Sequence, residues 1–177
     1  MSQPESGANN DENDGVAARA FAEHQAALLR YATRMLGDRE RAKDVVQDVY
    51  VRFLKEPAQA VDGHVVEWLY TVCRRRAIDV LRKEGRMTSF VEGAEVRLRA
   101  MDPLPGVALE QGEIHERLLR LIAALPPSQQ EVVRLKFQEG FSYKEISRIT
   151  ELSVGNVGFL IHTAVQRLRK AWETAGD

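Results

Sequence analysis

Positively charged side chains are concentrated in one short stretch of this 177-residue chain, between residues 74 and 86. The stretch reads RRRAIDVLRKEGR, and its cations are Arg74, Arg75, Arg76, Arg82, Lys83 and Arg86. Because the formal net charge of the chain is only -1, this positive charge is local, as a surface that binds a polyanion requires. Three consecutive arginines point in different directions around a helix, so at least one should lie close to buried surface. A basic helix end that only contacts water is the alternative.

Aromatic side chains near this stretch could stack on unpaired bases. Trp68 and Tyr70 precede the arginines, and Phe90 follows them. For Trp68 the sequence favours a different role, as an anchor of the hydrophobic core.

Acidic and amide side chains gather on the preceding predicted helix. Asp44, Gln47 and Asp48 share the side opposite its apolar residues. Such a patch could bind another protein, although a polar face that only contacts water is the default for these residue types. The residues by themselves leave both interpretations open.

The stretch from Ser142 to Lys170 predicts two helices joined by a tight turn at residues 150–152. Ser142 and Glu145 form an S-x-x-E capping box that begins the first helix. Ser153 can cap the second helix, whose apolar face holds Val154, Val157, Ile161, Ala164 and Leu168. A helix-turn-helix places its second helix in the major groove of DNA, and the last turns carry cations suited to phosphates, Arg167, Arg169 and Lys170. The alternative is a helical hairpin that only packs on its neighbours.

Apolar residues recur at helical spacing with almost no strand-like alternation, which predicts an all-α protein. We expect two small helical domains joined by a flexible linker, the C-terminal one containing the helix-turn-helix. Residues 1–15 are polar and acidic and should form a disordered tail. Residues 16–86 should form the first domain, with helices at about 16–36, 39–56 and 64–83. Gly37 should end the first of these helices, and Asp38 should cap the second.

Gly and Pro residues mark 87–112 as the linker, and 113–177 should form the second domain. Its first helix should span about 113–124. Ser128 and Glu131 predict a capping box for the next helix, with Phe137 among its apolar residues.

The residues argue against catalysis and against a metal site. The four histidines are scattered, and no metalloprotease, nucleophile-elbow or phosphate-loop motif occurs. Cys73 is the only cysteine, so an intramolecular disulfide is impossible. The N-terminus does not resemble a signal peptide, and no apolar run approaches the ~20 residues that span a bilayer. We therefore expect a soluble cytoplasmic protein that is not an enzyme, binds no cofactor and does not insert into membranes.

With these elements in order, the chain resembles the extracytoplasmic-function (ECF) sigma factors, the smallest class of bacterial sigma subunit. The resemblance covers about Phe21 to Trp172 and rests on LGDRERAKDVVQDVYVRFLK, WLYTVCRRRAIDVLRKEGR, LIAALPPSQQEVVRLKFQEGFSYKEIS and SVGNVGFLIHTAVQRLRK. The first two stretches resemble the helices of sigma region two that dock on RNA polymerase and open the −10 element. The last two resemble region four, which binds the β flap and reads the −35 element. Each stretch alone is weakly specific, but all of them in this order are highly specific.

The resemblance implies roles for individual residues. It implies that the β′ clamp helices of the RNA polymerase core bind Asp44, Gln47 and Asp48. The −10 element of promoter DNA should contact Trp68, Arg74, Arg75, Arg76, Asp79, Arg82, Lys83 and Arg86. The −35 element should contact Ser153, Asn156, Phe159, Leu160, His162, Thr163, Arg167 and Lys170. An anti-sigma factor is a further expected partner.

Several positions depart from the family pattern. The family commonly has Asn at Arg75 and an apolar residue at Arg76, which affects the exact −10 preference. It usually places cations near Gly158, Leu160, Thr163 and Val165, so −35 binding here should lose about one unit of salt slope per missing phosphate contact. Apolar side chains can still contact a thymine methyl, and Asn156 can pair with adenine. Glu151 replaces the usual turn glycine, which predicts a turn that is either slightly strained or differently shaped.

Two other functions remain open. A stand-alone helix-turn-helix regulator would bind duplex DNA without polymerase, but the docking motif argues against it, and co-purification with core polymerase would decide. A sigma-like decoy would act only by occupying an anti-sigma factor. The shortage of cations on the last helix keeps this second alternative open, and failure to support transcription from any genomic promoter would favour it.

Overall fold

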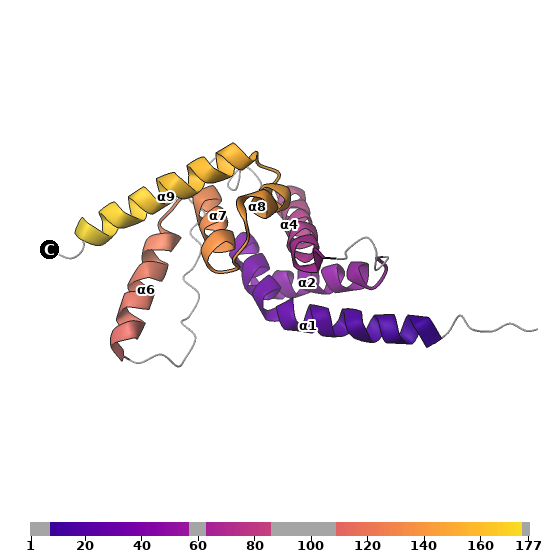
Figure 1. Cartoon of the computed structure of the whole chain (residues 1–177). Coiled ribbons are helices and arrows are strands. Elements are labelled where there is room, and N and C mark those ends of the chain that lie inside the picture. The colour runs from indigo at the N-terminus through magenta and orange to yellow at the C-terminus, as the bar shows by residue number, and fades with distance from the viewer. Residues whose placement is uncertain (1–7, 57–62, 86–108, 175–177) are drawn as a thin grey trace, which may run out of the picture. The chain divides into compact units, whose positions relative to one another are not determined.

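The computed structural model describes residues 8–56, 63–85 and 109–174, and every regular element within these ranges is an α-helix (Figure 1). The chain divides into two units, Met1–Glu84 and Gly85–Asp177. The all-α prediction with two helical domains is therefore confirmed. Most of the predicted linker lies outside the described residues, as do Arg86 and Phe90.

The first unit is built from α1 (Ala8–Leu36), α2 (Arg39–Phe53) and α4 (Val65–Lys83), and each of these helices contacts the other two (Figure 1). An aromatic pair lies at each of the three interfaces: Phe21–Tyr50, Tyr31–Tyr70 and Phe53–Trp68, with ring centroids 4.7, 5.1 and 5.7 Å apart. Large aromatic rings contribute much of the apolar area in a small core. The faces of α2 and α4 that point away from this core are fixed by the same packing.

The ends of these helices follow local rules. Gly37 has a φ of 68° after α1, and the Asp38 side chain then caps α2 by accepting hydrogen bonds from the backbone N–H groups of Glu40 and Arg41. Both features match the sequence expectation. The helix α1 begins at Ala8 and not near residue 16, so residues 8–15 of the predicted tail are helical.

The second unit contains α6 (Leu109–Ala123), α7 (Pro127–Phe137), α8 (Tyr143–Thr150) and α9 (Val154–Thr174). The last helix contacts the other three, and α8 also contacts α7. Ile122, Leu125, Val133 and Ala164 form a buried cluster against which Leu168 packs. The predicted apolar face of α9 is largely confirmed, since Val157, Ile161 and Ala164 are buried, and Ile146 and Ile149 of α8 are buried as well.

Some local predictions are wrong. The capping box of Ser128 and Glu131 does not form, because α7 begins at Pro127 and Pro126 occupies the N-cap position without a side-chain bond. Proline suits the first helical position, since its ring fixes φ and its missing N–H has no partner there anyway. The side chain of Gln130 instead donates to the backbone carbonyls of Ala123 and Leu125, which closes the turn between α6 and α7.

Three apolar residues also lie elsewhere than predicted. Phe137 is 63% exposed and Val154 is 45% exposed, so neither belongs to the buried face of its helix. Tyr70 is 1% exposed and packs against Tyr31, so its ring cannot stack on unpaired bases. The tertiary contacts of each helix decide these exposures, and the apolar stripe by itself does not.

Candidate functional site

The polar face of α2 forms a continuous surface on the first unit. Asp44 and Gln47 are exposed, and the side chain of Asp48 keeps 48% of its surface open to solvent. Val51 and Leu54, which are 43% and 38% exposed, follow on the same side one and two turns later. We call these five residues the α2 patch. The two apolar members were not predicted, although Val51 lies three or four residues after Asp48 and Gln47, and Leu54 lies three residues after Val51.

The outward face of α4 carries residues at spacings of seven, eleven and fourteen from Trp68. These residues are Arg75, Asp79 and Arg82, and together with Trp68 they form what we call the α4 face. The ring of Trp68 is half-buried against Phe53, so it anchors the core on one side and meets solvent on the other. The carboxylate of Asp79 lies 3.7 Å from the guanidinium of Arg82 and tethers it. Lys83 is exposed beside this face.

The three consecutive arginines diverge as expected. Arg75 points outward, while the guanidinium of Arg76 turns toward α2 and forms an ion pair with the carboxylate of Asp48. The side chain of Arg76 is only 26% exposed. Asp48 and Arg76, which were predicted to bind different partners, therefore contact each other, and Arg76 does not lie on the α4 face. Arg74, which is half-buried, lies on the opposite flank from Arg76.

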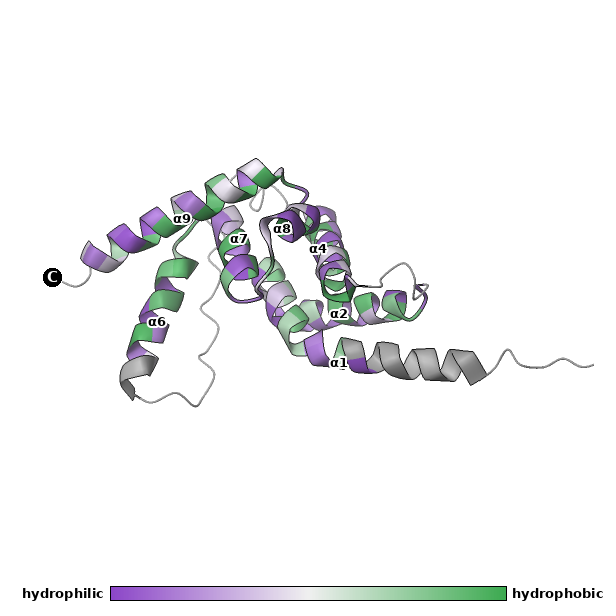
Figure 2. Ribbon diagram, viewed as in Figure 1, coloured by the Kyte–Doolittle hydropathy of each residue, from purple (hydrophilic) through white to green (hydrophobic). Residues whose placement is uncertain are grey.

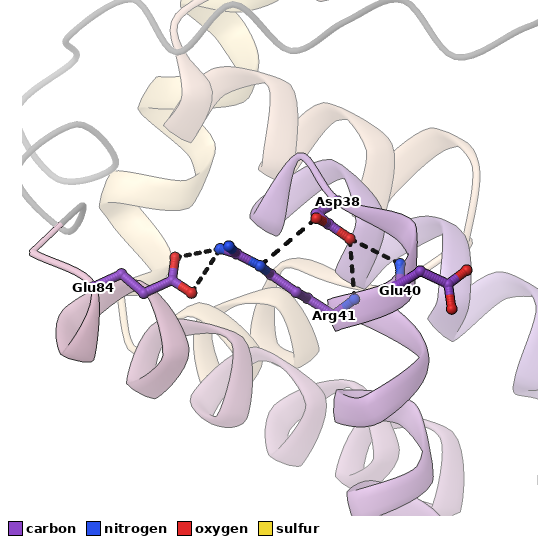
Figure 3. A network of polar contacts seen from close by, with 4 residues as sticks. All are labelled: Asp38, Glu40, Arg41 and Glu84. Atoms are coloured by element: carbon purple, nitrogen blue, oxygen red, sulfur yellow. Dashed lines mark hydrogen bonds and ion pairs between the residues drawn. The ribbon is translucent and has the colours of Figure 1, made fainter.

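A second polar network joins the start of α2 to the end of α4 (Figure 3). One guanidinium nitrogen of Arg41 donates to both carboxylate oxygens of Glu84, and Nε of Arg41 lies 3.6 Å from the Asp38 carboxylate. Asp38 is also the N-cap of α2, so the same carboxylate begins this helix and pairs with Arg41, which reaches Glu84 at the end of α4. Together with the pair of Asp48 and Arg76, this network sets the α2 patch and the α4 face in a fixed relation.

The turn before α9 is tightly specified. Ser142 and Glu145 form the predicted capping box, and the hydrogen bonds from Ser142 lower the pKa of the Glu145 carboxyl below its ordinary value. Glu151 adopts a left-handed conformation with a φ of 62°, the one positive φ among the non-glycine residues that the structure describes. The hydroxyl of Ser147 donates to the carbonyl of Leu152 at 2.5 Å. The predicted strain at Glu151 is therefore present, and a side chain from α8 holds the turn closed.

The predicted −35 residues occupy the outward side of α9. Ser153 accepts a hydrogen bond from the backbone N–H of Asn156 at 3.2 Å and so caps the helix as expected. Phe159 is 65% exposed, whereas Leu160 is half-buried. The exposed His162 ring bonds to Gln166 at 2.9 Å, and the Thr163 hydroxyl donates to the carbonyl of Phe159 at 2.8 Å.

The cations of α9 all lie in its C-terminal half. Arg167 donates to the side-chain oxygen of Gln129 on α7 at 3.3 Å, while Lys170 is exposed. Figure 2 shows the hydrophilic colour concentrated toward this end of α9, with neutral and hydrophobic colours near the turn. The cations are thus placed for the rim of a binding surface, and uncharged side chains occupy its centre.

Among the described residues, no group of three or more His, Cys, Asp and Glu side chains could hold a metal ion. Cys73 is fully buried, and burial raises the pKa of its thiol to about 12, so the thiol stays protonated. The helices of the described ranges are all too short or too polar to cross a membrane.

Comparison with known protein families identifies two regions of the chain, and these contain the surfaces described above. The description "Sigma-70 region 2" matches residues 20–87, and "Sigma-70, region 4" matches residues 115–168. Together these spans make up more than half of the chain. The α2 patch and the α4 face lie in the first span, and all predicted −35 residues except Lys170 lie in the second.

The relatives narrow the family further. The chain is 29% identical over 160 residues to the ECF RNA polymerase sigma factor SigL of Mycobacterium tuberculosis, with 88% of each chain covered. It is also 28% identical to SigE of Mycolicibacterium smegmatis over 149 residues, a match that covers 83% of this chain. The chain belongs to the ECF sigma factors. This sigma factor spans only 58% of the length of SigE.

A solved structure has the same fold as this sigma factor. It is the sigma factor RpoE of Bartonella quintana, crystallised with the anti-sigma factor NepR, and the two folds agree with a TM-score of 0.64 at 22% identity. The comparison covers 88% of this chain and 96% of RpoE. At this identity the likeness concerns the arrangement of the helices.

Proposed function

We propose that this sigma factor binds the β′ clamp helices of core RNA polymerase through the α2 patch. The exposed stripe of acidic, amide and apolar side chains in region 2 is the observation that carries the proposal. A protein interface of this kind needs apolar area at its centre and polar groups around it. Val51 and Leu54 supply the apolar area, and Asp44 and Gln47 supply the polar groups.

The α4 face then binds the opened −10 element. Opening duplex DNA costs a few kcal/mol for each unstacked step. Stacking of a base on an aromatic ring returns about 1–3 kcal/mol. The solvent-facing side of Trp68 offers such a ring, while Arg75 and Arg82 offer guanidinium groups for the phosphates on either side. Binding to the separated strand thus offsets the cost of melting, and the factor contributes no chemical step of its own.

The second unit binds the −35 element through α9 and the polymerase through the β flap. Its capped and closed helix-turn-helix suits insertion of the first turns of α9 into the major groove. Because the fold of the chain resembles that of a sigma factor crystallised with the anti-sigma factor NepR, we also propose an anti-sigma factor as a partner. Its proposed location is the bacterial cytoplasm, where RNA polymerase acts.

Assembly with core polymerase tests the first proposed contact. We expect Gln47→Ala combined with Val51→Ala to weaken binding of the full chain to core RNA polymerase, measured by fluorescence anisotropy of labelled sigma factor. Arg39→Ala is the matched control, because Arg39 is exposed on the same helix but lies away from the patch. Equal affinity of the double variant and the wild type would contradict the assignment of the α2 patch.

Open-complex formation tests the second contact. Arg75→Ala combined with Arg82→Ala should leave core binding unchanged and reduce opening of promoter DNA, reported by a fluorescent base analogue in the −10 element. Lys144→Ala, which changes an exposed cation on α8, controls for the loss of positive charge alone. Promoter opening by the double variant at the wild-type level would show that the α4 face does not hold the opened strand.

A further inference from the structure

The first three turns of α9 carry no formal charge. Residues 154–166 contain no Lys, Arg, Asp or Glu, and the nearest cation along the helix is Arg167. Phosphate contacts from this part of the helix can therefore come only from backbone N–H and neutral side chains. Any base preference here must rest on amide, hydroxyl, imidazole and apolar groups.

Phe159 lies at the centre of the outward side of these turns. It sits opposite the buried residues Val157, Ile161 and Ala164, and at 65% it is the most exposed large apolar side chain in the part of the chain that the structure describes. A single exposed apolar residue is ordinary on a protein surface. Its meaning here comes from its position on the helix that is proposed to enter the major groove.

The surroundings of Phe159 leave its ring accessible. Gly155 lies one turn before Phe159 on the same side of the helix and has no side chain. A Cβ atom added at Gly155 would meet nothing within 4 Å. On the other side, the hydroxyl of Thr163 is tied to the backbone carbonyl of Phe159. With no side chain at Gly155 and 65% of its own surface exposed, Phe159 is accessible in the N-terminal part of α9, the part that contacts base edges in helix-turn-helix proteins.

We propose that Phe159 contacts the 5-methyl group of a thymine in the −35 element, and that promoters served by this sigma factor carry thymine at that position. This inference rests on the proposed function, because it requires α9 to lie in the major groove. The thymine methyl is the apolar group that a base pair presents there, and an aromatic ring can bury it without a hydrogen bond. Exposed Asn156, on a flank of the same surface, is suited to pair with a neighbouring adenine.

Selection from a randomised −35 element tests the preference. Holoenzyme made from the full chain and core RNA polymerase would select promoters from a duplex library, and the DNA retained by the holoenzyme would be sequenced to identify the selected −35 bases. The wild type should enrich thymine at one or more positions, and Phe159→Ala should lose that enrichment at one of them. Phe137→Ala is the matched control, because Phe137 is 63% exposed but lies on α7, outside the helix-turn-helix.

Removal of the methyl group alone tests the contact. Deoxyuridine differs from thymidine only by this methyl, and its substitution at the enriched position should weaken wild-type promoter binding about fourfold, as expected for one methyl group left unburied. With Phe159→Ala the two bases should bind equally well. Phe159→Leu, which keeps an apolar side chain, should retain part of the difference.

Four outcomes overturn the inference. Wild-type enrichment without thymine would do so, as would equal binding of thymidine and deoxyuridine by the wild type. Weaker binding of Phe159→Ala to core polymerase with an unchanged base preference would show that Phe159 faces a protein. In these three cases promoter-directed initiation by the wild type still stands. Failure of the wild-type holoenzyme to initiate at any promoter is different, because it overturns the proposed function together with the inference.

Discussion

Breaking the ion pair between Asp48 and Arg76 should destabilise the first unit by a measurable amount. The side chains are 48% and 26% exposed, and Nε of Arg76 is buried without a hydrogen-bond partner among the described residues. Exposed ion pairs contribute about 0–1 kcal/mol, and a pair with one mostly buried member belongs at the upper end of that range. After discounting for the solvent around Asp48, we expect a coupling energy of about 1 kcal/mol. For a domain of this size that corresponds to roughly 4–8 °C in Tm.

The two tryptophans allow the first unit to be followed in the full chain. Trp68 lies in the first unit and Trp172 in the second, so Trp172→Phe leaves a single fluorescent reporter between α2 and α4. In this background, urea unfolding would be measured for Asp48→Asn, Arg76→Gln and the double variant. The free energies of unfolding from the three variants and their parent form a double-mutant cycle. Single-variant effects that add to within about 0.3 kcal/mol would refute the pair as a stabilising contact.

The same variants separate stability from polymerase docking. Asp48→Asn removes both the internal pair and a proposed docking carboxylate, whereas Arg76→Gln removes the pair and keeps the carboxylate. We therefore expect Asp48→Asn to bind core polymerase more weakly than Arg76→Gln under conditions where both are folded. Equal losses of affinity would mean that Asp48 acts only by holding α4, and its assignment to the α2 patch would be wrong.

Three further predictions concern single residues. Glu151→Gly should raise the unfolding free energy of the second unit by roughly 0.5–1 kcal/mol, since glycine tolerates a φ of 62°. Gly140→Ala should lower this free energy, because Gly140 has a φ of 79°. Trp172 fluorescence reports both changes. Cys73 should react with thiol reagents only as fast as the first unit opens, because it is buried and its pKa is raised to about 12. The lowered pKa of Glu145 stabilises the fold at pH values above the ordinary carboxyl pKa of about 4.3. This stabilisation should disappear as the pH falls through the lower pKa of the folded state. Glu145→Gln should therefore make the unfolding free energy of the second unit less dependent on pH in the acid range.

Local rules predicted much of the fold because they depend on neighbours in sequence. Asp38 and Ser142 are both N-caps as expected, since an N-cap needs only its own helix to form. The same rules failed at Ser128, where Pro127 starts the helix first. Exposed Phe137 and Val154 show a different limit, because an apolar stripe states which residues could be buried but not how much of the stripe another helix covers.

Local rules likewise predicted only part of the candidate site. Periodicity placed Asp44 and Gln47 on the polar side of α2, and the run of arginines implied that at least one would approach buried surface. Which arginine does so depends on how α2 crosses α4, and residue Asp48 is 28 positions away from Arg76 in sequence. A contact of that kind arises only from tertiary packing. Val51 and Leu54 were not predicted, because only polar side chains were considered for the exposed side of this helix.

With the proposed contacts, the distribution of charge divides promoter recognition between the two units. The α4 face carries arginines, so its attraction for DNA is electrostatic, weakens as salt rises and discriminates little between sequences. The outward side of α9 is uncharged for three turns, so its contribution is short-ranged, less sensitive to salt and dependent on the bases that it meets. A weak −35 contact is then sufficient, because a polymerase that holds both units as proposed makes the second binding step occur at high effective concentration. Selectivity in this sigma factor can therefore reside in a few neutral side chains of α9, while the affinity comes mainly from polymerase and from the −10 contacts.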